Sequence, residues 1–491
     1  MKCCSITRKN LWKFPPECDK VVVALRLESA LCNDEGERNM SVENDLGRDN
    51  IRRLVLRIAL PSMLAQFVSV LYSIVDRMYI GNIPRIGDVA LAGVGVCGPV
   101  VTMIGSVASL VGIGGSPLMS RRMGEGRMDE ARKILSNAFV LLLSLAVILA
   151  VAMIAIRRPM LMLFGASEAT YPYADVYFTT YLTGTVFALL STGMNQFIIA
   201  QGFAKVGMLS VILGAVLNII LDPVFIFVLG MGVEGAAVAT VLSQLASCVF
   251  VLAFLFGKRV PVRITFGGYS PGIMGKILVM GFTPFIIIAI DNVMIIALNA
   301  VLARYSAPGE GDMLITCATI VQSFMLVVTM PLGGISSGTQ TILAYNYGAG
   351  RKDRVMTAQR YIVFLCVAYT ALLFAAARTI SPLFVRLFTA NPQIADTAVW
   401  AIGISTMALI PLGAQYAVVD GFTGLGQVRY ALQLSFFRKL VYFVPLFILP
   451  VFFGAKAVFF AEPISDIAGP VVTAILYAAV MPRLMGEKKH Y

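Results

Sequence analysis

The stretch Leu54–Gly81, "LVLRIALPSMLAQFVSVLYSIVDRMYIG", is an apolar segment that is long enough to cross a lipid bilayer as one α-helix. Near its end it carries an aspartate and an arginine, Asp76 and Arg77. Ionisable side chains at membrane depth are rare, and they usually mark an ion or substrate path. The stretch therefore predicts a membrane-spanning fold with a polar site inside it.

The same apolar pattern recurs along the whole chain. Its 491 residues are 58% hydrophobic and 13% charged, with a mean hydropathy of +0.82. About twelve windows have the usual spanning length of roughly 20 apolar residues. They begin near Leu54, Ala90, Ile134, Tyr173, Met208, Val233, Ile277, Leu314, Tyr361, Ala398, Ala431 and Ala457. The runs are continuous rather than alternating, which excludes a β-barrel and predicts an all-α polytopic membrane protein with about twelve transmembrane helices.

Basic residues concentrate in one set of loops. The rich loops are the segment before the first span, Arg121–Lys133, Gly257–Arg263, Gly350–Arg354 and the tail after Met481. They hold roughly twenty basic residues against fewer than ten on the other side, so we expect both termini to be cytoplasmic and the membrane to be the cell inner membrane. The net charge of +12 then reflects topology and attraction to membrane lipids, and we expect no nucleic acid partner.

The first fifty residues lack an apolar core long enough for a signal peptide and are expected to be a disordered tail. Four cysteines lie there: Cys3, Cys4, Cys18 and Cys32. Without histidines or a paired CxxC spacing, we interpret them as free thiols rather than a metal site. Met40 begins "MSVENDLGRDNIRR", a natural start for such a chain, so residues 1–39 are expected to be dispensable or to come from a misassigned start codon.

An internal repeat organises the remainder, because similar segments recur about 220 residues apart. Ser120–Leu135 pairs with Ala344–Gln359, and Asn195–Met208 pairs with Ala414–Gln427. Each half then holds six spans, and an even number returns the chain to its starting side, so the copies run parallel about an axis along the membrane normal. The expected division is a tail at 1–50, a six-helix lobe at 51–257, a linker at 258–272, a second six-helix lobe at 273–484 and a tail at 485–491.

The chain carries few of the residues that drive chemistry. No GxxxxGK[ST] phosphate loop occurs, and "GVGVCG" at 93–98 lies inside a span, where small residues pack helices. The sole histidine, His490, is the penultimate residue. We therefore expect no enzyme and no cofactor; an intramembrane enzyme, the remote alternative, would need a clustered nucleophile and base or a metal set.

Four polar residues fall at similar depth in the first six spans. Asp222 and Thr240 lie about nine residues on either side of the turn at Met231, which puts both roughly 12 to 14 Å into the bilayer. Asn218 lies one turn deeper on the face of Asp222, and Asp76 agrees in depth to within two turns. Such a group would take up a proton or coordinate Na⁺ with carboxylate, amide and hydroxyl oxygens. The alternative for Asp76 is an ion pair with Arg77 or a position at the interface.

Other polar residues inside the spans are candidates for a substrate cavity. They are Gln66, Tyr72, Asn195, Gln196, Asp291, Asn299, Gln415 and Arg438. Asp291 lies deep and has no obvious local partner, whereas Asp420 lies at a helix end, where a loop role is expected. Glu462 and Asp466 are one turn apart, and the nearby prolines predict a broken helix.

Several motifs together resemble the multidrug and toxin extrusion (MATE) family. They are "PSMLAQFVSVLYSIVDRMYIGNI", "SRRMGEGRMDEARK", "NQFIIAQG", "LNIILDPVFIF…MGVEGAAVAT" and "GTQTILAYNYGAG", and the similarity covers nearly everything from Leu46 onward. The resemblance implies a V-shaped pair of six-helix bundles that exports small organic cations by proton or sodium antiport. In its DinF-like branch, the cation site matches Asp76, Asn218, Asp222 and Thr240, whereas the tail at 1–50 has no counterpart.

The function expected from the sequence is thus secondary active export of organic cations by a monomer, with H⁺ or Na⁺ as the coupling ion and no resident cofactor. The alternative within transporters is a flippase for lipid-linked precursors. A flippase would want a wide cationic cavity for pyrophosphate, for which Arg438 and Lys439 are the main candidates.

Overall fold

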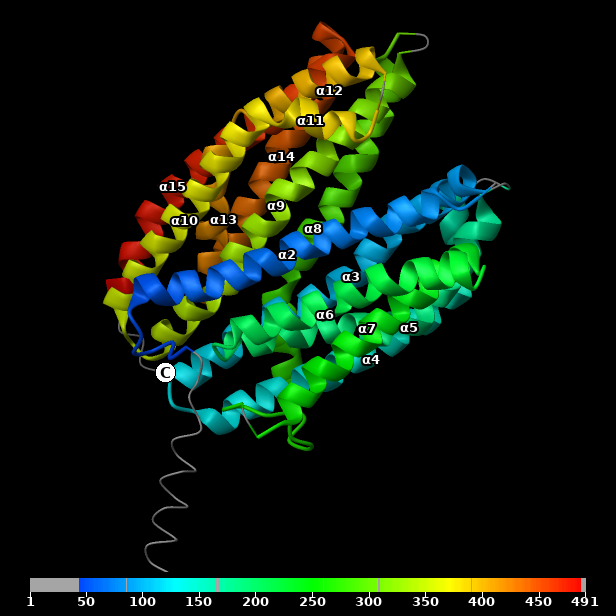
Figure 1. The fold of residues 1–491 in the computed structure, drawn as a ribbon. Coiled ribbons are helices and arrows are strands. Elements are labelled where there is room, and N and C mark those ends of the chain that lie inside the picture. The colour runs from blue at the N-terminus through cyan, green and yellow to red at the C-terminus, as the bar shows by residue number, and fades with distance from the viewer. Residues whose placement is uncertain are drawn as a thin grey trace, which may run out of the picture. The chain divides into compact units, whose positions relative to one another are not determined.

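The computed structural model describes residues 44–486 except 85, 165, 167, 169, 259, 308, 309 and 390. All regular secondary structure in these residues is helical (Figure 1). The expectations for Cys3, Cys4, Cys18, Cys32, Met40 and His490 lie outside the described residues. Within the segment expected to be a tail, the residues from Asn44 onward are packed against the rest of the chain.

The first half of the chain forms six long helices. They are α2 (Ile51–Gly81), α3 (Gly87–Gly124), α4 (Met128–Leu163), α5 (Tyr171–Ala200), α6 (Ala204–Pro223) and α7 (Gly232–Phe256). A short π-helix, η1 (Val224–Val228), continues α6. Within this half, α5 packs against α3, α4 and α7, and α6 packs against α2 and α7.

The second half repeats this plan with more breaks. Its helices are α8 (Pro271–Tyr305), α9 (Gly311–Gly348), α10 (Lys352–Thr379), α11 (Ser381–Arg386), α12 (Pro392–Ser405), α13 (Leu409–Gly424), α14 (Val428–Phe453) and α15 (Ala461–Gly486). A 3-10 turn, η2 (Ala455–Phe460), leads into α15. Glu462 and Asp466 therefore lie in the first turns of α15, which runs without a break through Pro470, so the predicted broken helix is confined to the η2 junction.

Eleven of the described helices are long and apolar enough to span a membrane. A twelfth span arises if α12 and α13, which meet at a 52° bend, count as one. The prediction of about twelve helical spans in an all-α polytopic membrane protein is therefore confirmed.

The two halves touch where glycines allow backbone contact. Helix α2 packs on α9, and α3 packs on both α8 and α9 (Figure 1). A Cβ atom on Gly281 would lie 1.7 Å from the carbonyl oxygen of Leu110, and one on Gly124 would lie 2.0 Å from that of Tyr345. Because any side chain would force the helices apart, these small residues determine the distance between the halves. A Cβ atom on Gly348, the repeat partner of Gly124, would likewise lie 2.2 Å from the carbonyl oxygen of Arg121.

A short segment before α2 bridges the two halves. Asn44 Nδ2 donates to the Gly202 carbonyl at 2.7 Å, at the α5–α6 turn. On the other half, Asn346 Nδ2 donates to the Leu46 carbonyl at 2.9 Å, and Arg354 Nη2 donates to the Asp49 carbonyl at 2.8 Å. These bonds hold the halves together at the end of the molecule where α2 begins.

Candidate functional site

Four polar side chains meet between α2, α6 and α7. Asn218 Nδ2 donates to Asp222 Oδ1 at 3.0 Å and lies 3.4 Å from Thr240 Oγ1. The Asp76 and Asp222 carboxyl groups are neighbours that interact electrostatically. The structure thus brings together the four residues that the sequence grouped by depth, whereas their role in cation coupling stays a prediction.

This cluster is buried and forms no salt bridge in the part of the chain that the structure describes. Asp222 is 0% exposed and Asp76 is 9% exposed. Arg77 is exposed and forms no described salt bridge with Asp76, although its charge lies close enough to act on this carboxyl group. Two carboxyl groups held together away from solvent favour a state in which a cation is shared between them.

Three oxygens of the cluster have the chemistry of cation ligands. Asp76 Oδ1, Asn218 Oδ1 and Asp222 Oδ2 are buried and have no hydrogen-bond donor among the described residues. Buried acceptors without a donor are costly, and either a proton or a hard cation such as Na⁺ relieves that cost. The Thr240 hydroxyl adds a fourth oxygen beside the amide of Asn218.

A break in the backbone follows Asp222. Pro223 has no N–H group, and α6 ends there. The chain continues as the π-helix η1, in which the Leu229 N–H donates to the Val224 carbonyl at 2.8 Å. Widened turns of this kind are rare and often occur at functional sites. Asp222 thus sits in the last turn before the break, with its side chain held by Asn218 one turn earlier.

The cluster borders a cavity of about 280 Å³ in the first half. Among the residues that line the cavity are Gln66, Tyr72, Asn195, Gln196, Asn218 and Thr240. Asp76 and Asp222 are not part of the lining, so they lie behind its wall, next to Asn218 and Thr240. Met330 of α9 also lines the cavity, which therefore reaches the interface with the second half.

Two of the lining residues also tie helices together. Asn195 Nδ2 donates to the Gly207 carbonyl at 3.3 Å, and Asn195 Oδ1 accepts from Ser210 Oγ at 3.3 Å, so this amide joins α5 to α6. Sequence reasoning missed Gln244, which lines the cavity. Its position one turn beyond Thr240 on the same face of α7 could have identified Gln244 as a candidate.

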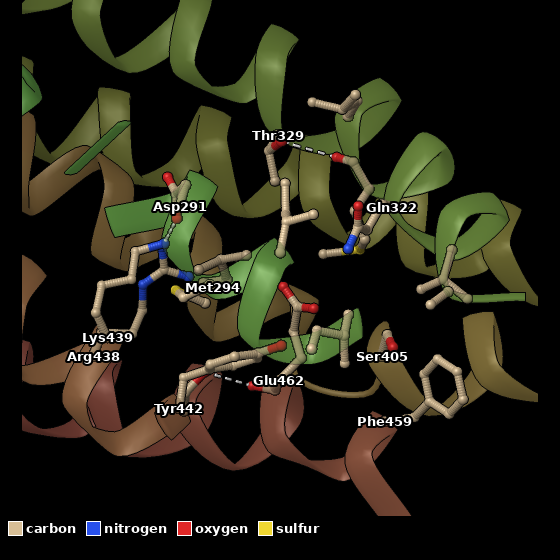
Figure 2. Close-up of a pocket in the computed structure, with 18 of the residues that line it drawn as sticks. Asp291, Met294, Gln322, Thr329, Ser405, Arg438, Lys439, Tyr442, Phe459 and Glu462 are labelled. Atoms are coloured by element: carbon tan, nitrogen blue, oxygen red, sulfur yellow. Dashed lines mark hydrogen bonds and ion pairs between the residues drawn. The ribbon is translucent and has the colours of Figure 1, made fainter. Parts of the chain in front are cut away.

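The second half holds a different cavity of about 240 Å³. Figure 2 shows Arg438, Lys439, Asp291 and Glu462 around it, with apolar side chains such as Met294 between them. Lys439 Nζ forms an ion pair with Asp291 Oδ1, and Arg438 Nη1 lies 2.9 Å from Asp466 Oδ1 behind the wall. Both basic residues at this cavity are therefore paired with an acid, whereas no such pair is described beside the cavity of the first half.

The structure gives one of the single acids a distant partner and corrects the expectation for another. Asp291 has a partner, Lys439, which is too distant along the chain for local reading to find. Asp420 does not lie in a loop, because it falls inside α13 and its carboxylate accepts a hydrogen bond from Ser336 Oγ of α9.

Two predicted cavity residues do not line either cavity. Asn299 lies on α8 and is half-buried. Gln415 of α13 is 2% exposed and packs beside Arg438, because both approach Gly469 of α15. Of the candidates in the second half, Asp291 and Arg438 line the cavity there.

Comparison with known proteins places this architecture in a family. The MatE family model matches residues 61–224 and 284–448, one match in each half. The multidrug export protein MepA of Staphylococcus haemolyticus is 23% identical over 89% of this chain and 96% of its own length. The FAD transporter of Shewanella oneidensis is 24% identical over 85% of this chain and 92% of its own.

Solved structures show the same fold. One is the outward-facing conformation of a multidrug resistance MATE family transporter of the MOP superfamily, with a TM-score of 0.84 at 24% identity. The match covers 90% of this chain and 98% of that structure. The repeat of six spans and the paired matches of the family model agree. The chain therefore belongs to the MatE family of multi-pass membrane transporters.

Proposed function

We propose that the chain is a secondary active exporter of small organic compounds, driven by H⁺ or Na⁺ antiport. The observation that carries this proposal is the pair of buried carboxyl groups, Asp76 and Asp222, which adjoin a cavity and lack a described basic partner. A carboxylate that gains or loses a cation changes its interactions with its surroundings. That difference supplies the differential affinity that a conformational switch requires.

The coupling step follows from the cluster. Without a cation, the two neighbouring carboxylates repel each other, and α2 and α6 are pushed apart where they carry Asp76 and Asp222. With a proton or Na⁺ bound, the same groups attract and α2 closes on α6. Because α2 also packs on α9, a shift of α2 alters the contact between the halves. Alternating exposure of the central cavity to the two sides of the membrane would follow.

The proposed cargo is a small organic cation. Support comes from relatives named as multidrug export proteins and from the excess of acidic over basic groups beside the cavities. The FAD transporter among the relatives carries a different kind of molecule, so cargo varies within the family. We propose transport, not catalysis, and a monomer without a resident cofactor as the working unit.

We also propose that the protein resides in the cell inner membrane with both termini cytoplasmic. The support is the excess of basic residues in the loops on one side. In this orientation the Asn44–Asn50 segment and the glycine contacts at Gly124 and Gly348 lie on the cytoplasmic side.

The test is efflux of a fluorescent organic cation from proteoliposomes that contain the purified protein. A proton gradient and a sodium gradient are imposed separately, with empty liposomes as the control. Transport under one gradient supports antiport and identifies the ion. Absence of transport under both gradients, with the fold verified by circular dichroism, would contradict the proposal.

The flippase alternative has less support. It needs free cationic groups for a pyrophosphate, whereas Arg438 is paired with Asp466 and Lys439 with Asp291. Acceleration of a fluorescent lipid-linked pyrophosphate across the bilayer, without any gradient-driven dye efflux, would favour the flippase instead.

A further inference from the structure

The charged groups around the cavity of the second half do not balance. Arg438 and Lys439 are basic, whereas Asp291, Glu462 and Asp466 are acidic. The two ion pairs use both basic residues, so one carboxylate is left over. Among the described residues, Glu462 forms no ion pair.

Glu462 is placed to receive a ligand. It lines the cavity of about 240 Å³, and Figure 2 shows its carboxyl group directed toward the space between Met294 and Ser405. Figure 2 also places Tyr442 beside Glu462, and Phe459 lies at the same wall. A lone carboxylate among aromatic and thioether groups suits a protonated amine on an apolar body.

The paired groups limit the charge of that ligand. Asp466 is fully buried, and its pairing with Arg438 keeps this charge out of the cavity. Asp291 is held by Lys439, whose side chain is 8% exposed. As long as both pairs persist and Glu462 is ionised, the cavity presents one net negative charge. A single positive charge neutralises the cavity, whereas a second one has no carboxylate to meet.

We propose that this cavity is a binding site for amphipathic monocations, with Glu462 as the counter-ion and Lys439 and Arg438 as the residues that exclude dications. The inference rests on the proposed export function, since it assigns the cargo amine to the second half and the coupling ion to Asp76 and Asp222 in the first. Cargo and coupling ion then bind to different carboxylates and occupy the protein at the same time. The ion drives release by moving the halves rather than by displacing the amine.

The test is equilibrium binding of ligands that share one ring to the purified, full-length protein. They are 4-methylbenzylamine (one positive charge), 4-methylbenzyl alcohol (neutral), 1,4-benzenedimethanamine (two positive charges) and 4-methylbenzoate (one negative charge). We expect the monocation to bind about tenfold or more tighter than each of the others, as a charged hydrogen bond in a desolvated site allows. Equal binding of the alcohol and the amine to the unaltered protein overturns the inference, and this arm depends on no variant.

Two variants test which charged side chains determine the preference for the monocation. Glu462→Gln is expected to weaken the amine about tenfold and to leave the alcohol within about twofold, because it removes only the counter-ion. Lys439→Met frees Asp291, which is expected to improve the dication about tenfold relative to the monocation. Retention of full amine affinity in Glu462→Gln overturns the assignment to Glu462, and an unchanged preference in Lys439→Met overturns the role of the pairs in excluding dications.

Matched controls lie in the same half. Glu310 and Lys456 form a half-exposed ion pair at 3.4 Å and neither residue lines the cavity, so Glu310→Gln and Lys456→Met should leave all four affinities unchanged.

A variant of the first half separates this inference from the proposed function. Asp222→Asn should keep the amine affinity while export stops. Loss of amine binding in Asp222→Asn would place the amine in the first half and overturn this inference. Amine binding to Glu462 without gradient-driven export in the unaltered protein would instead contradict the proposed function alone.

Discussion

The two halves share a six-span plan but differ in how the acids within their spans are paired. In the first half, Asp76 and Asp222 approach each other, and their neighbours are an amide and a hydroxyl. In the second half, Asp291 and Asp466 each face a basic residue of α14. Carboxylates without a salt bridge are therefore paired with each other in the first half, whereas in the second half two of the three around the cavity are neutralised by basic residues and only Glu462 is not.

The difference shows how one repeat can serve two tasks. A carboxylate whose counter-ion is part of the protein gains little from a bound proton or Na⁺. One without such a partner must take a cation from solution or remain an unsatisfied buried charge. Two basic residues of one helix, Arg438 and Lys439 of α14, thus distinguish the two halves. We assign ion coupling to the first half and cargo binding to the second.

The largest expected effect is on export through Asp222. Asp222→Asn removes the carboxylate but keeps an oxygen that accepts from Asn218, so we expect a folded protein whose dye efflux falls about 100-fold or more, to the level of empty liposomes. Efflux under the coupling gradient measures this. Asp129→Asn, at an exposed site beside Arg132, is the control and should export normally. Robust gradient-driven export by folded Asp222→Asn protein would remove Asp222 from the mechanism.

In the second half, the large effect should be on stability. Arg438→Met leaves Asp466 buried without its counter-ion, which we expect to lower the free energy of unfolding by about 3 to 5 kcal/mol. Denaturant or thermal unfolding in detergent measures it. Adding Asp466→Asn to Arg438→Met should recover most of the loss, because no buried charge then remains. A single variant as stable as the original protein would show that this pair does not neutralise the second half.

A smaller effect is expected at Thr240. Thr240→Val removes one oxygen of the cluster while keeping its shape, and we expect the affinity for the coupling ion to fall about fivefold to tenfold, roughly the value of one hydrogen bond. The ion concentration that gives half-maximal efflux measures this. Thr240→Ser retains the hydroxyl and is the matched control. If Thr240→Val and Thr240→Ser reach half-maximal efflux at the same ion concentration, the Thr240 hydroxyl is not part of the ion site.

The smallest effect should come from Asp420. Its carboxylate accepts from Ser336 Oγ, and Asp420→Asn keeps an oxygen for that hydrogen bond. We expect efflux to remain within about twofold of the original rate, because the residue has a partner in its own half. Side-by-side efflux assays with Asp222→Asn provide the measurement. A loss as large as that of Asp222→Asn would mean that coupling acids occur in both halves.

Much of the first half's site was accessible from the sequence because its distances are local. Asn218 and Asp222 are one helical turn apart, and Thr240 lies symmetrically across one short turn from Asp222. The number of residues between each of them and the nearest turn therefore predicts one common depth in the membrane. The same count from the loop after α2 predicts a similar depth for Asp76. The number of spans followed from the lengths of the apolar runs, with one span bent between α12 and α13.

The second half's site depended on helix rotation, which counting residues does not reveal. Lys439 meets Asp291, and Arg438 meets Asp466, across different helices. Spans that are apolar on every side carry little periodicity to show which face points inward. Asn299 illustrates the limit, because it looked like a cavity residue but lies off both cavities.

The sequence by itself thus determined the membrane fold, the two-fold repeat and the depth of Asp76, Asn218, Asp222 and Thr240, because hydrophobic length and helical rise are properties of the chain alone. Only the tertiary structure decided which acids are paired, where the cavities lie and how closely the halves approach at Gly281 and Leu110. Those features arise from how each helix is rotated and packed against helices distant in sequence, and packing contacts of that kind exist only after the whole bundle has formed.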